Sequence, residues 1–123
     1  MSAPDAADDP ALATLREAMR RFAAERDWDQ FHSPKNLAAA LSVEAAELLE
    51  HFQWLGEEAS RALPAPKRER VAEEMADVLL YLVRLADKLD VDLVAAAHAK
   101  LARNAEKYPV EKSRGSARKY DEL

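Results

Sequence analysis

The sequence predicts an all-α protein that folds as a four-helix bundle. Apolar side chains recur three or four residues apart in four separate segments, as they do on the buried face of an amphipathic helix. No segment shows the strict alternation of a half-buried strand. The only glycines, Gly56 and Gly115, are too few for a glycine-rich phosphate loop. A chain of 123 residues is large enough for one domain with a single core.

Four helices are expected between residues 9 and 110, which form the predicted domain. A capping side chain followed by proline, as in Asp9-Pro10 and Ser33-Pro34, predicts the start of the first two helices. Two prolines prevent residues 57–66 from forming one continuous helix, and Asp92 is placed to cap the last helix. The expected helices cover residues 10–26, 34–56, 67–89 and 93–108.

Two segments without helical periodicity flank this domain. Residues 1–8 are acidic, contain proline and have no apolar run, so they are expected to be disordered. Residues 111–123 are basic in their middle part and are expected to form a C-terminal tail.

The helix expected over residues 67–89 is apolar over more of its circumference than a single stripe. Leu80 and Val83 extend the apolar sector beyond the main set. A small bundle has only one interior, so a helix of this kind predicts an oligomer. The main apolar set is Val71, Met75, Val78, Leu79, Leu82, Leu85, Ala86 and Leu89.

Composition excludes several classes of protein. The chain has no cysteine, so it offers neither a disulfide framework nor a thiolate metal site nor a cysteine nucleophile. A net charge of −5 argues against binding to a nucleic acid polymer, which usually requires a basic face. No window approaches 18 uninterrupted apolar residues, so no membrane span is expected. These features favour a soluble cytoplasmic protein.

Four acidic residues form two pairs with helical spacing. Glu44 and Glu47 are three residues apart on the second expected helix, and Glu74 and Asp77 are three apart on the third. If these helices pack antiparallel, the four carboxylates converge and repel one another unless a cation is present. Carboxylate oxygens suit Mg²⁺, with Mn²⁺ as a substitute. The alternative is a solvated acidic surface, because the chain has 23 acidic residues.

A di-iron site is the obvious rival to this metal site. Such sites use a histidine three residues after a glutamate, and none of His32, His51 and His98 has a glutamate in that position. We therefore do not expect iron. His51 lies on the flank of the second expected helix and is interpreted as a packing or surface residue.

With these residues in place, the chain resembles the MazG-like all-α nucleoside triphosphate pyrophosphohydrolases. Their ExxE and ExxD motifs match Glu44-x-x-Glu47 and Glu74-x-x-Asp77, which are separated by 26 residues. The stretches FAAERDWDQFHSPKNL, ELLEHFQW, EEMADVLLYLVRLA and SARKYDEL are most similar to the dCTP pyrophosphatase branch. The resemblance implies Mg²⁺-dependent cleavage of dCTP, a modified dCTP or another dNTP to the monophosphate and pyrophosphate, which cleanses the nucleotide pool. It also favours an oligomer, either a homotetramer built as a dimer of dimers or at least a dimer.

The resemblance also implies roles for individual residues. Glu44 and Glu47 are the candidates for the general base, and all four carboxylates hold the metal. Trp28 and Trp54 match the walls of the base pocket, and Trp54 is expected on the same side of its helix as Glu47. The further substrate-binding candidates are His32, Tyr81, Lys100, Asn104, Lys107, Arg118 and Lys119.

The chemistry of some of these residues, and of Met19, bears on substrate choice. The ring of Tyr81 beside the sugar disfavours a ribose 2′-hydroxyl and therefore favours deoxyribonucleotides. Lys100 and Lys107 can neutralise phosphate, although their alternative is a solvated surface position. Met19 stands where some relatives carry a base-contacting histidine, which leaves the base preference open.

Two other functions remain open on the sequence. The chain can be a nucleotide-binding regulatory module that hydrolyses nothing, or a purely structural helical oligomer with a solvated acidic face. Pyrophosphate release distinguishes the first from an enzyme, and stabilisation by Mg²⁺ with dCTP distinguishes the second.

Overall fold

A computed structural model describes residues 9–123, and the prediction for residues 1–8 lies outside the described part of the chain. The predicted all-α class is confirmed, since the described residues contain helices and turns but no strand. The structure divides them into two units, residues 10–91 and residues 92–123 with Asp9. The helices are α2 (Pro10–Glu25), η1 (Asp29–Phe31), α3 (Pro34–Glu50), α4 (Glu57–Arg61), α5 (Ala65–Leu89), α6 (Leu93–Lys107), α7 (Val110–Ser113) and η2 (Tyr120–Glu122).

Helix α3 begins where the sequence predicts but ends six residues early. Ser33 caps its start, and the Ser33 hydroxyl accepts a hydrogen bond from the Asn36 N–H at 3.1 Å. At the other end the His51 N–H donates to the Leu48 carbonyl, which tightens the chain into successive turns over residues 51–54. The prediction that this helix reaches Gly56 was therefore wrong, and Trp54 does not share a helix face with Glu47.

Helix α5 is the longest element and begins two residues before its predicted start. Pro66 lies in its first turn, where the missing N–H needs no partner. The helix ends at Leu89, and the next residue, Asp90, has a left-handed backbone (φ 55°), while the Val91 N–H donates to the Ala86 carbonyl at 2.9 Å. These are the bonds of a Schellman ending, with aspartate in place of the more common glycine.

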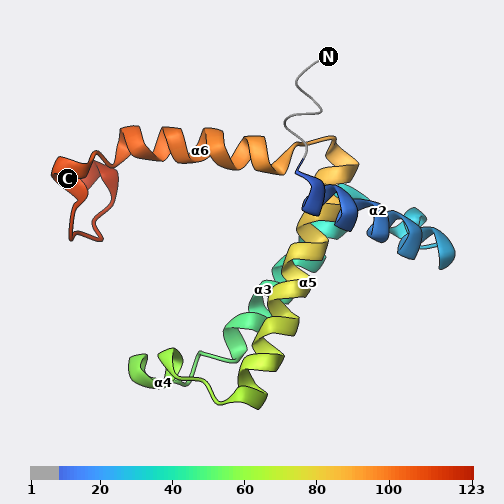
Figure 1. The fold of residues 1–123 in the computed structure, drawn as a ribbon, viewed down its shortest axis with the longest axis horizontal. Helices are drawn as coiled ribbons and strands as arrows, with labels where there is room; N and C mark the ends of the chain where they lie inside the picture. The colour runs from blue at the N-terminus through green and yellow to red at the C-terminus, as the bar shows by residue number, and fades with distance from the viewer. Residues whose placement is uncertain (1–8) are drawn as a thin grey trace. The chain divides into compact units, whose positions relative to one another are not determined.

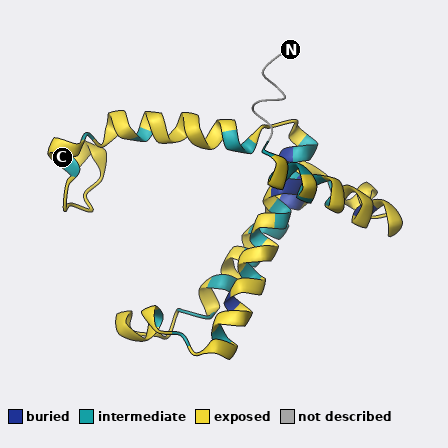
Figure 2. Cartoon of the chain, viewed as in Figure 1, coloured by how far each residue is buried: buried dark blue, intermediate teal, exposed yellow. Residues whose placement is uncertain are grey.

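Residues 10–91 form a three-helix unit. Figure 1 shows α3 and α5 side by side and antiparallel, with α2 crossing the C-terminal half of α5. The buried apolar residues are Ala23 from α2, Leu37 from α3, and Val71, Val83 and Ala86 from α5. Most of the buried positions gather where α2 crosses the other two helices (Figure 2). This small core holds α3 and α5 together, and they carry the acidic pairs.

A stripe of apolar side chains on α5 is exposed in the single chain. Met75, Leu79, Leu82 and Leu89 recur at helical spacing, and each is 36% exposed or more. The sequence places these four in the apolar set of this helix, but the packing of residues 10–91 covers them only in part. This stripe is called the α5 apolar stripe below.

The second unit contains α6, α7 and η2. Asp92 caps α6, as predicted, because its carboxylate accepts the Ala95 N–H at 3.0 Å. The tail is more helical than its lack of periodicity indicates. Pro109 precedes α7, and the Tyr120 ring packs edge-on against Tyr108 with 6.2 Å between centroids. Among the described residues, no helix has both the length and the apolar composition that crossing a membrane requires.

Candidate active site

The structure brings three of the four predicted metal ligands together. Glu44 projects from α3, and Glu74 and Asp77 project from α5. One carboxylate oxygen from each lies within 4.8 Å of the others. Three residues of helix separate Glu74 from Asp77, so both reach the side of α5 that packs on α3. The antiparallel pairing of the two helices therefore produces the convergence that the spacing predicts.

Glu47 and His51 complete the surroundings of this cluster. Glu47 follows Glu44 by one turn on α3, and its carboxyl is close enough to influence the pKa values of both Glu44 and Glu74. The His51 Nε2 lies 3.8 Å from the Glu74 Oε1. Our interpretation of His51 as a packing or surface residue misses this position. Its spacing of four residues from Glu47 was the available signal. The four acids are called the acidic cluster below.

Like charge and partial burial shift the acid–base behaviour of the acidic cluster. Burial is the main cause that raises the pKa of Glu44 to about 7, and the hydrogen bond and negative charge of Glu47 raise it further. Burial and the charge of Glu47 also raise the pKa of Glu74. Both carboxyl groups therefore resist ionisation when no cation is nearby.

Two buried oxygens show that the acidic cluster fits a metal ion. Glu44 Oε2 and Glu74 Oε2 are buried and have no hydrogen-bond partner among the described residues. A buried polar atom without a partner is costly, and a divalent cation would satisfy both oxygens and cancel the repulsion. All donors in the set are oxygens except the nearby His51 nitrogen, which favours a hard cation such as Mg²⁺ or Mn²⁺.

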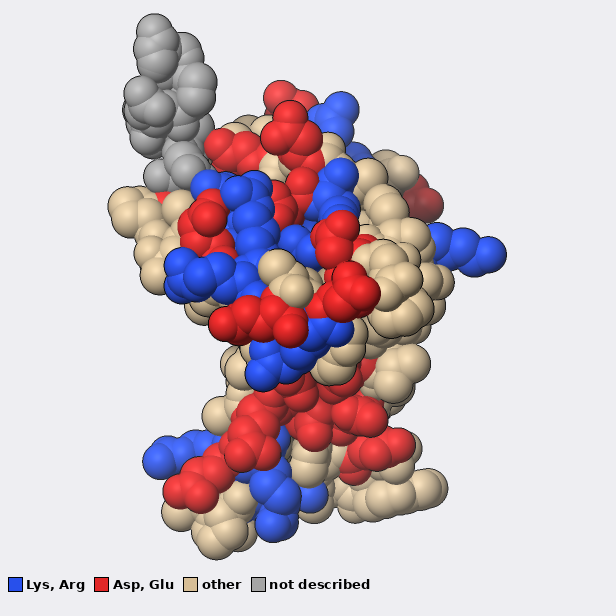
Figure 3. Space-filling view, turned by 90° about the vertical axis from the view of Figure 1, so that its right-hand side faces the viewer, with Lys and Arg blue, Asp and Glu red and all other residues tan. Residues whose placement is uncertain are grey.

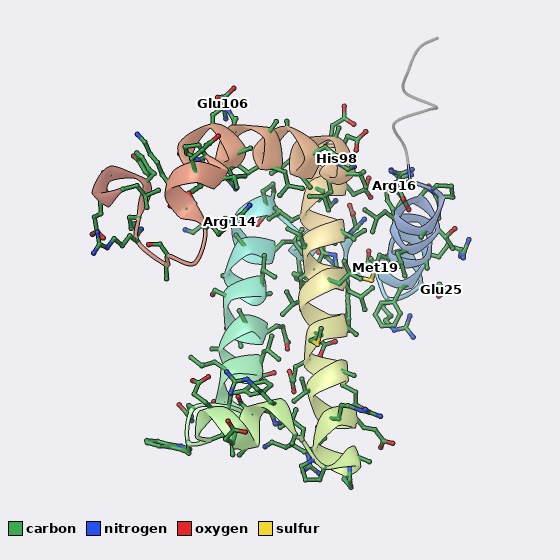
Figure 4. All side chains as sticks on the ribbon, turned by 60° about the vertical axis from the view of Figure 1, so that its left-hand side comes forward. Arg16, Met19, Glu25, His98, Glu106 and Arg114 are labelled. Carbon is green, nitrogen blue, oxygen red and sulfur yellow. The ribbon has the colours of Figure 1, made fainter. Side chains whose placement is uncertain are left out.

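A pocket of about 280 Å³ adjoins the acidic cluster, with Asp77 contributing to both. Three predicted substrate residues, Trp28, His32 and Tyr81, lie in its wall, where the Trp28 ring packs edge-on against Phe22 at 5.7 Å. Met19 also lines the pocket and points from α2 towards α5 (Figure 4). The lining residues are Met19, Phe22, Trp28, His32, Asp77, Leu80 and Tyr81. A largely apolar pocket with one carboxylate, that of Asp77, in its wall and the other acids nearby suits a ligand with an aromatic ring and a charged group.

Acidic side chains are unevenly distributed on the face shown in Figure 3. Figure 3 shows them gathered on the lower half of one face, while acidic and basic side chains alternate on its upper half. The concentration of acids is therefore local and does not follow from the net charge alone.

Of the predicted substrate residues within residues 10–91, Trp54 does not line this pocket. Trp54 follows the end of α3 and is 88% exposed in the single chain, so it forms no wall here. Five further predicted substrate residues belong to the unit of residues 92–123, and their part in the site stays a prediction. Within that unit the Lys107 ammonium lies 5.0 Å from the centre of the Tyr120 ring. These five are Lys100, Asn104, Lys107, Arg118 and Lys119.

Comparison with known proteins agrees with this geometry. The chain is 48% identical over 117 residues to mouse dCTP pyrophosphatase 1 and 45% identical over 117 residues to the human protein of that name, which covers 94% of this chain and 69% of each relative. A crystal structure of a pyrophosphatase from Archaeoglobus fulgidus superposes with a TM-score of 0.77 at 37% identity, over 82% of this chain and 94% of that one. The profile of the MazG-like family matches residues 39–123, which include the whole acidic cluster. The resemblance stated from the motifs is confirmed, and the chain belongs to the MazG-like family.

Proposed function

We propose that this chain is a metal-dependent nucleotide pyrophosphatase that hydrolyses dCTP, a 5-modified dCTP or another dNTP to the monophosphate and pyrophosphate. The relatives at 45% to 49% identity are dCTP pyrophosphatases. The observation that carries the proposal is that Asp77 belongs both to the acidic cluster and to the aromatic pocket. A base held in the pocket would therefore have its triphosphate beside the carboxylates. Such an activity removes unwanted nucleotides from the cytoplasmic pool.

The acidic cluster is proposed to hold Mg²⁺ through Glu44, Glu47, Glu74 and Asp77, with Mn²⁺ as a substitute. The unpartnered oxygens of Glu44 and Glu74 support this assignment. When bound, the metal supplies charge neutralisation for the triphosphate and a lower pKa for a bound water.

The carboxylates can also move a proton. Hydrolysis needs a group that accepts a proton from the attacking water, and a carboxylate that is not fully engaged elsewhere can do so. Glu44 and Glu47 are proposed for this role. Both come from α3, opposite the two acids of α5, and they face the bound triphosphate in this scheme.

The pocket is proposed to select the nucleoside. The Trp28 ring can stack on the base, an interaction of about 1 to 3 kcal/mol. Tyr81 stands one helical turn beyond Asp77, where its ring would fill the space of a ribose 2′-hydroxyl and favour deoxyribose. Met19 packs against a ring but offers no hydrogen-bond donor, so other residues must distinguish the edge of cytosine from that of another base.

For the remaining predicted residues, we propose substrate-binding roles from the family resemblance. Lys100, Asn104 and Lys107 would bind the phosphates, and Arg118 and Lys119 would close over them. Trp54 would form a second wall of the base pocket once the oligomer is assembled, since its side chain is almost fully exposed in the single chain.

A nucleotide panel with product identification tests the proposal. The purified protein is incubated with Mg²⁺ and each standard or 5-modified NTP and dNTP, and the products are identified by ³¹P NMR. Release of pyrophosphate and dCMP from dCTP supports it. Binding of dCTP without turnover indicates a regulatory module instead, and release of inorganic phosphate and dCDP shows cleavage at a different bond. A melting temperature unchanged by Mg²⁺ and dCTP together indicates a structural oligomer.

We also propose that the protein is a homotetramer, built as a dimer of dimers. The α5 apolar stripe supports this, because a monomeric protein rarely leaves an apolar helix face uncovered. Leu82→Asp puts a charge into the stripe and should convert the assembly into smaller species in light scattering after size exclusion. Ala76→Asp puts the same charge on an exposed position of α5 outside the stripe and should leave the mass unchanged. Equal masses for both variants and the parent would exclude the stripe as an interface.

A further inference from the structure

Arg84 is a buried cation that the proposed chemistry does not use. Its side chain is 4% exposed, and a buried charge is costly unless it is paired and hydrogen-bonded. Three of its nitrogens have acceptors. Its Nε donates to His32 Nδ1 at 3.1 Å, and Nη2 donates to Asp29 Oδ1 at 2.7 Å. Nη1 donates to Asp87 Oδ2 at 3.4 Å. Two of these acceptors neutralise the charge, but the third is the imidazole in the wall of the aromatic pocket.

The contact with Arg84 determines which tautomer His32 adopts. An arginine side chain has only donors and keeps its proton at every accessible pH, so His32 Nδ1 must accept with its lone pair. The imidazole proton is then on Nε2. Burial lowers the pKa of His32, and the positive charges of Arg84 and Lys88 lower it further, which disfavours a second proton. The His32 N–H of the backbone also donates to the Asp29 carbonyl at 3.0 Å, which fixes the loop.

We propose that Arg84 is a positioning residue that holds His32 as a neutral Nε2–H donor for an acceptor on the nucleotide in the aromatic pocket. This inference rests on the proposed function. The acceptor on the nucleotide is a carbonyl oxygen or ring nitrogen of the base, or an oxygen of the sugar. Without Arg84, the imidazole populates both tautomers and rotates about its side-chain bonds. The donor would then be available for only part of the time, and nucleotide binding would weaken.

The tautomer can be measured directly. Long-range ¹H–¹⁵N correlation spectra of histidine-labelled protein distinguish an Nε2–H ring from an Nδ1–H ring and from a doubly protonated one. His32→Ala identifies the His32 signals among those of the three histidines. We expect one Nε2–H tautomer for His32 in the parent and a mixture in Arg84→Met. An Nδ1–H or doubly protonated ring in the parent at neutral pH would overturn the proposal, and this measurement needs no change at Arg84.

Kinetics test whether Arg84 acts through His32. Arg84→Met should raise the KM for dCTP about 3- to 10-fold and change kcat less, as expected for one weakened hydrogen bond to substrate. In the His32→Ala background the same change should have little further effect on KM, because the two residues act as a unit. An equal rise in KM with and without His32 would show that Arg84 acts in another way. If Arg84→Met does not fold, Arg84→Lys allows the same comparison. Lysine keeps the positive charge but cannot donate to the three acceptors from three separate nitrogens.

Arg20 provides a matched control. It is also an arginine paired with Asp87, through Nε at 2.8 Å and Nη2 at 2.5 Å, and it is half-exposed. Arg20→Met should leave both the His32 signals and the KM within about 2-fold of the parent, because the net contribution of one exposed ion pair is small. Equal effects from Arg20→Met and Arg84→Met would mean that general loosening of this ion-pair network explains the result. A parent protein that hydrolyses no nucleotide would remove the proposed function, whereas the tautomer of His32 would still test the structural half of the inference.

Discussion

One face of α5 carries two charged regions of opposite character. Glu74, Asp77, Tyr81, Arg84 and Lys88 follow one another at spacings of three and four, so they lie within an arc of roughly 80° on the helix. The first two belong to the acidic cluster. The last two belong to an ion-pair network, and Tyr81 stands between the regions. The same helix face therefore presents unneutralised acid at one end and paired base at the other.

The two regions differ in whether their charges are paired within the chain. In the ion-pair network, Arg84 binds Asp29 and Asp87, Arg20 binds Asp87, and Lys88 binds Asp29. Hydrogen bonds from Lys88 lower the pKa of Asp29, and those from Arg20 lower the pKa of Asp87. In the acidic cluster the pKa values of Glu44 and Glu74 rise instead, and one oxygen of each has no hydrogen-bond partner among the described residues. A paired network is complete without a ligand, whereas a cluster of like charges needs one.

The largest expected effect is on turnover, at the acidic cluster. Glu47→Gln removes one negative charge and one candidate base while keeping the shape of the side chain, so kcat should fall by about 100-fold or more with little loss of folding. Pyrophosphate release and thermal unfolding measure the two quantities. Glu50→Gln, an exposed position one turn further along α3, is the matched control. Full activity in Glu47→Gln would remove Glu47 from the catalytic and metal-binding set.

The second-largest expected effect is on the KM for dCTP, through the aromatic pocket between the two regions. Trp28→Ala removes a ring that lines the pocket, so the KM for dCTP should rise roughly 5- to 150-fold, which corresponds to the free energy of stacking on one base. The KM should change more than kcat, because stacking acts on the ground and transition states alike. Trp54→Ala tests whether Trp54 also contributes to the base pocket. A KM unchanged by Trp54→Ala would exclude Trp54 from the base pocket, and a KM unchanged by Trp28→Ala would exclude Trp28.

The third expected effect is on the free energy of unfolding, which should depend on pH and on Mg²⁺ through the acidic cluster. The pKa of Glu44 is about 7 in the folded chain, above its ordinary value of 4.5. The unfolded chain therefore loses this proton first, and the free energy of unfolding without metal falls as the pH rises from about 4.5 through about 7. Mg²⁺ binds the ionised cluster, so its stabilising effect should grow over the same pH range, to about 2.7 kcal/mol at 100 times its Kd.

Thermal unfolding with Mg²⁺ and with a chelator, from about pH 5 to about pH 8, checks this expectation. Glu44→Gln has no ionisable group at this position and is the control, in which most of the pH dependence should disappear. A gain from Mg²⁺ that is the same at both ends of the range would contradict the assignment.

The smallest effects should have opposite signs in the two regions. Without metal at neutral pH, Glu44→Gln removes a repelled charge and should raise the free energy of unfolding. Asp87→Asn removes a charge that is nine-tenths buried between two arginines, and it should lower the free energy of unfolding by about 1 to 3 kcal/mol. Denaturant unfolding with a chelator present measures both. Shifts in the same direction would show that the contrast between the regions does not control stability.

Local sequence patterns predicted most of the fold. Helix starts at Pro10, Pro34 and Leu93 were predicted correctly, because a cap and a first-turn proline act within one helical turn. Helix ends were less accurate. The end of α3 depends on the turns over residues 51–54, which no single capping residue announces. That error placed Trp54 beside Glu47, and the structure separates them.

The candidate site was predictable in part for the same reason. Two acids three residues apart must share a helix face, so the carboxylate pairs could be predicted from spacing alone. His51 was missed because its partner Glu74 lies on another helix. Its spacing of four residues from Glu47 indicates that it lies near the acidic pair of α3, but no local pattern shows that Glu74 of α5 lies opposite it.

The sequence by itself determined the helical class, the two carboxylate pairs and the family. Each of these depends on residues close together in the chain or on sequence motifs that can be recognised without a structure. Only the tertiary structure decided that the carboxylates share one site and that Asp77 also lines the aromatic pocket. It also decided that Arg84 binds His32, which is 52 residues away in the sequence. The physical reason is that periodicity specifies the direction of a side chain on its own helix, whereas packing of helices against each other decides what that side chain meets.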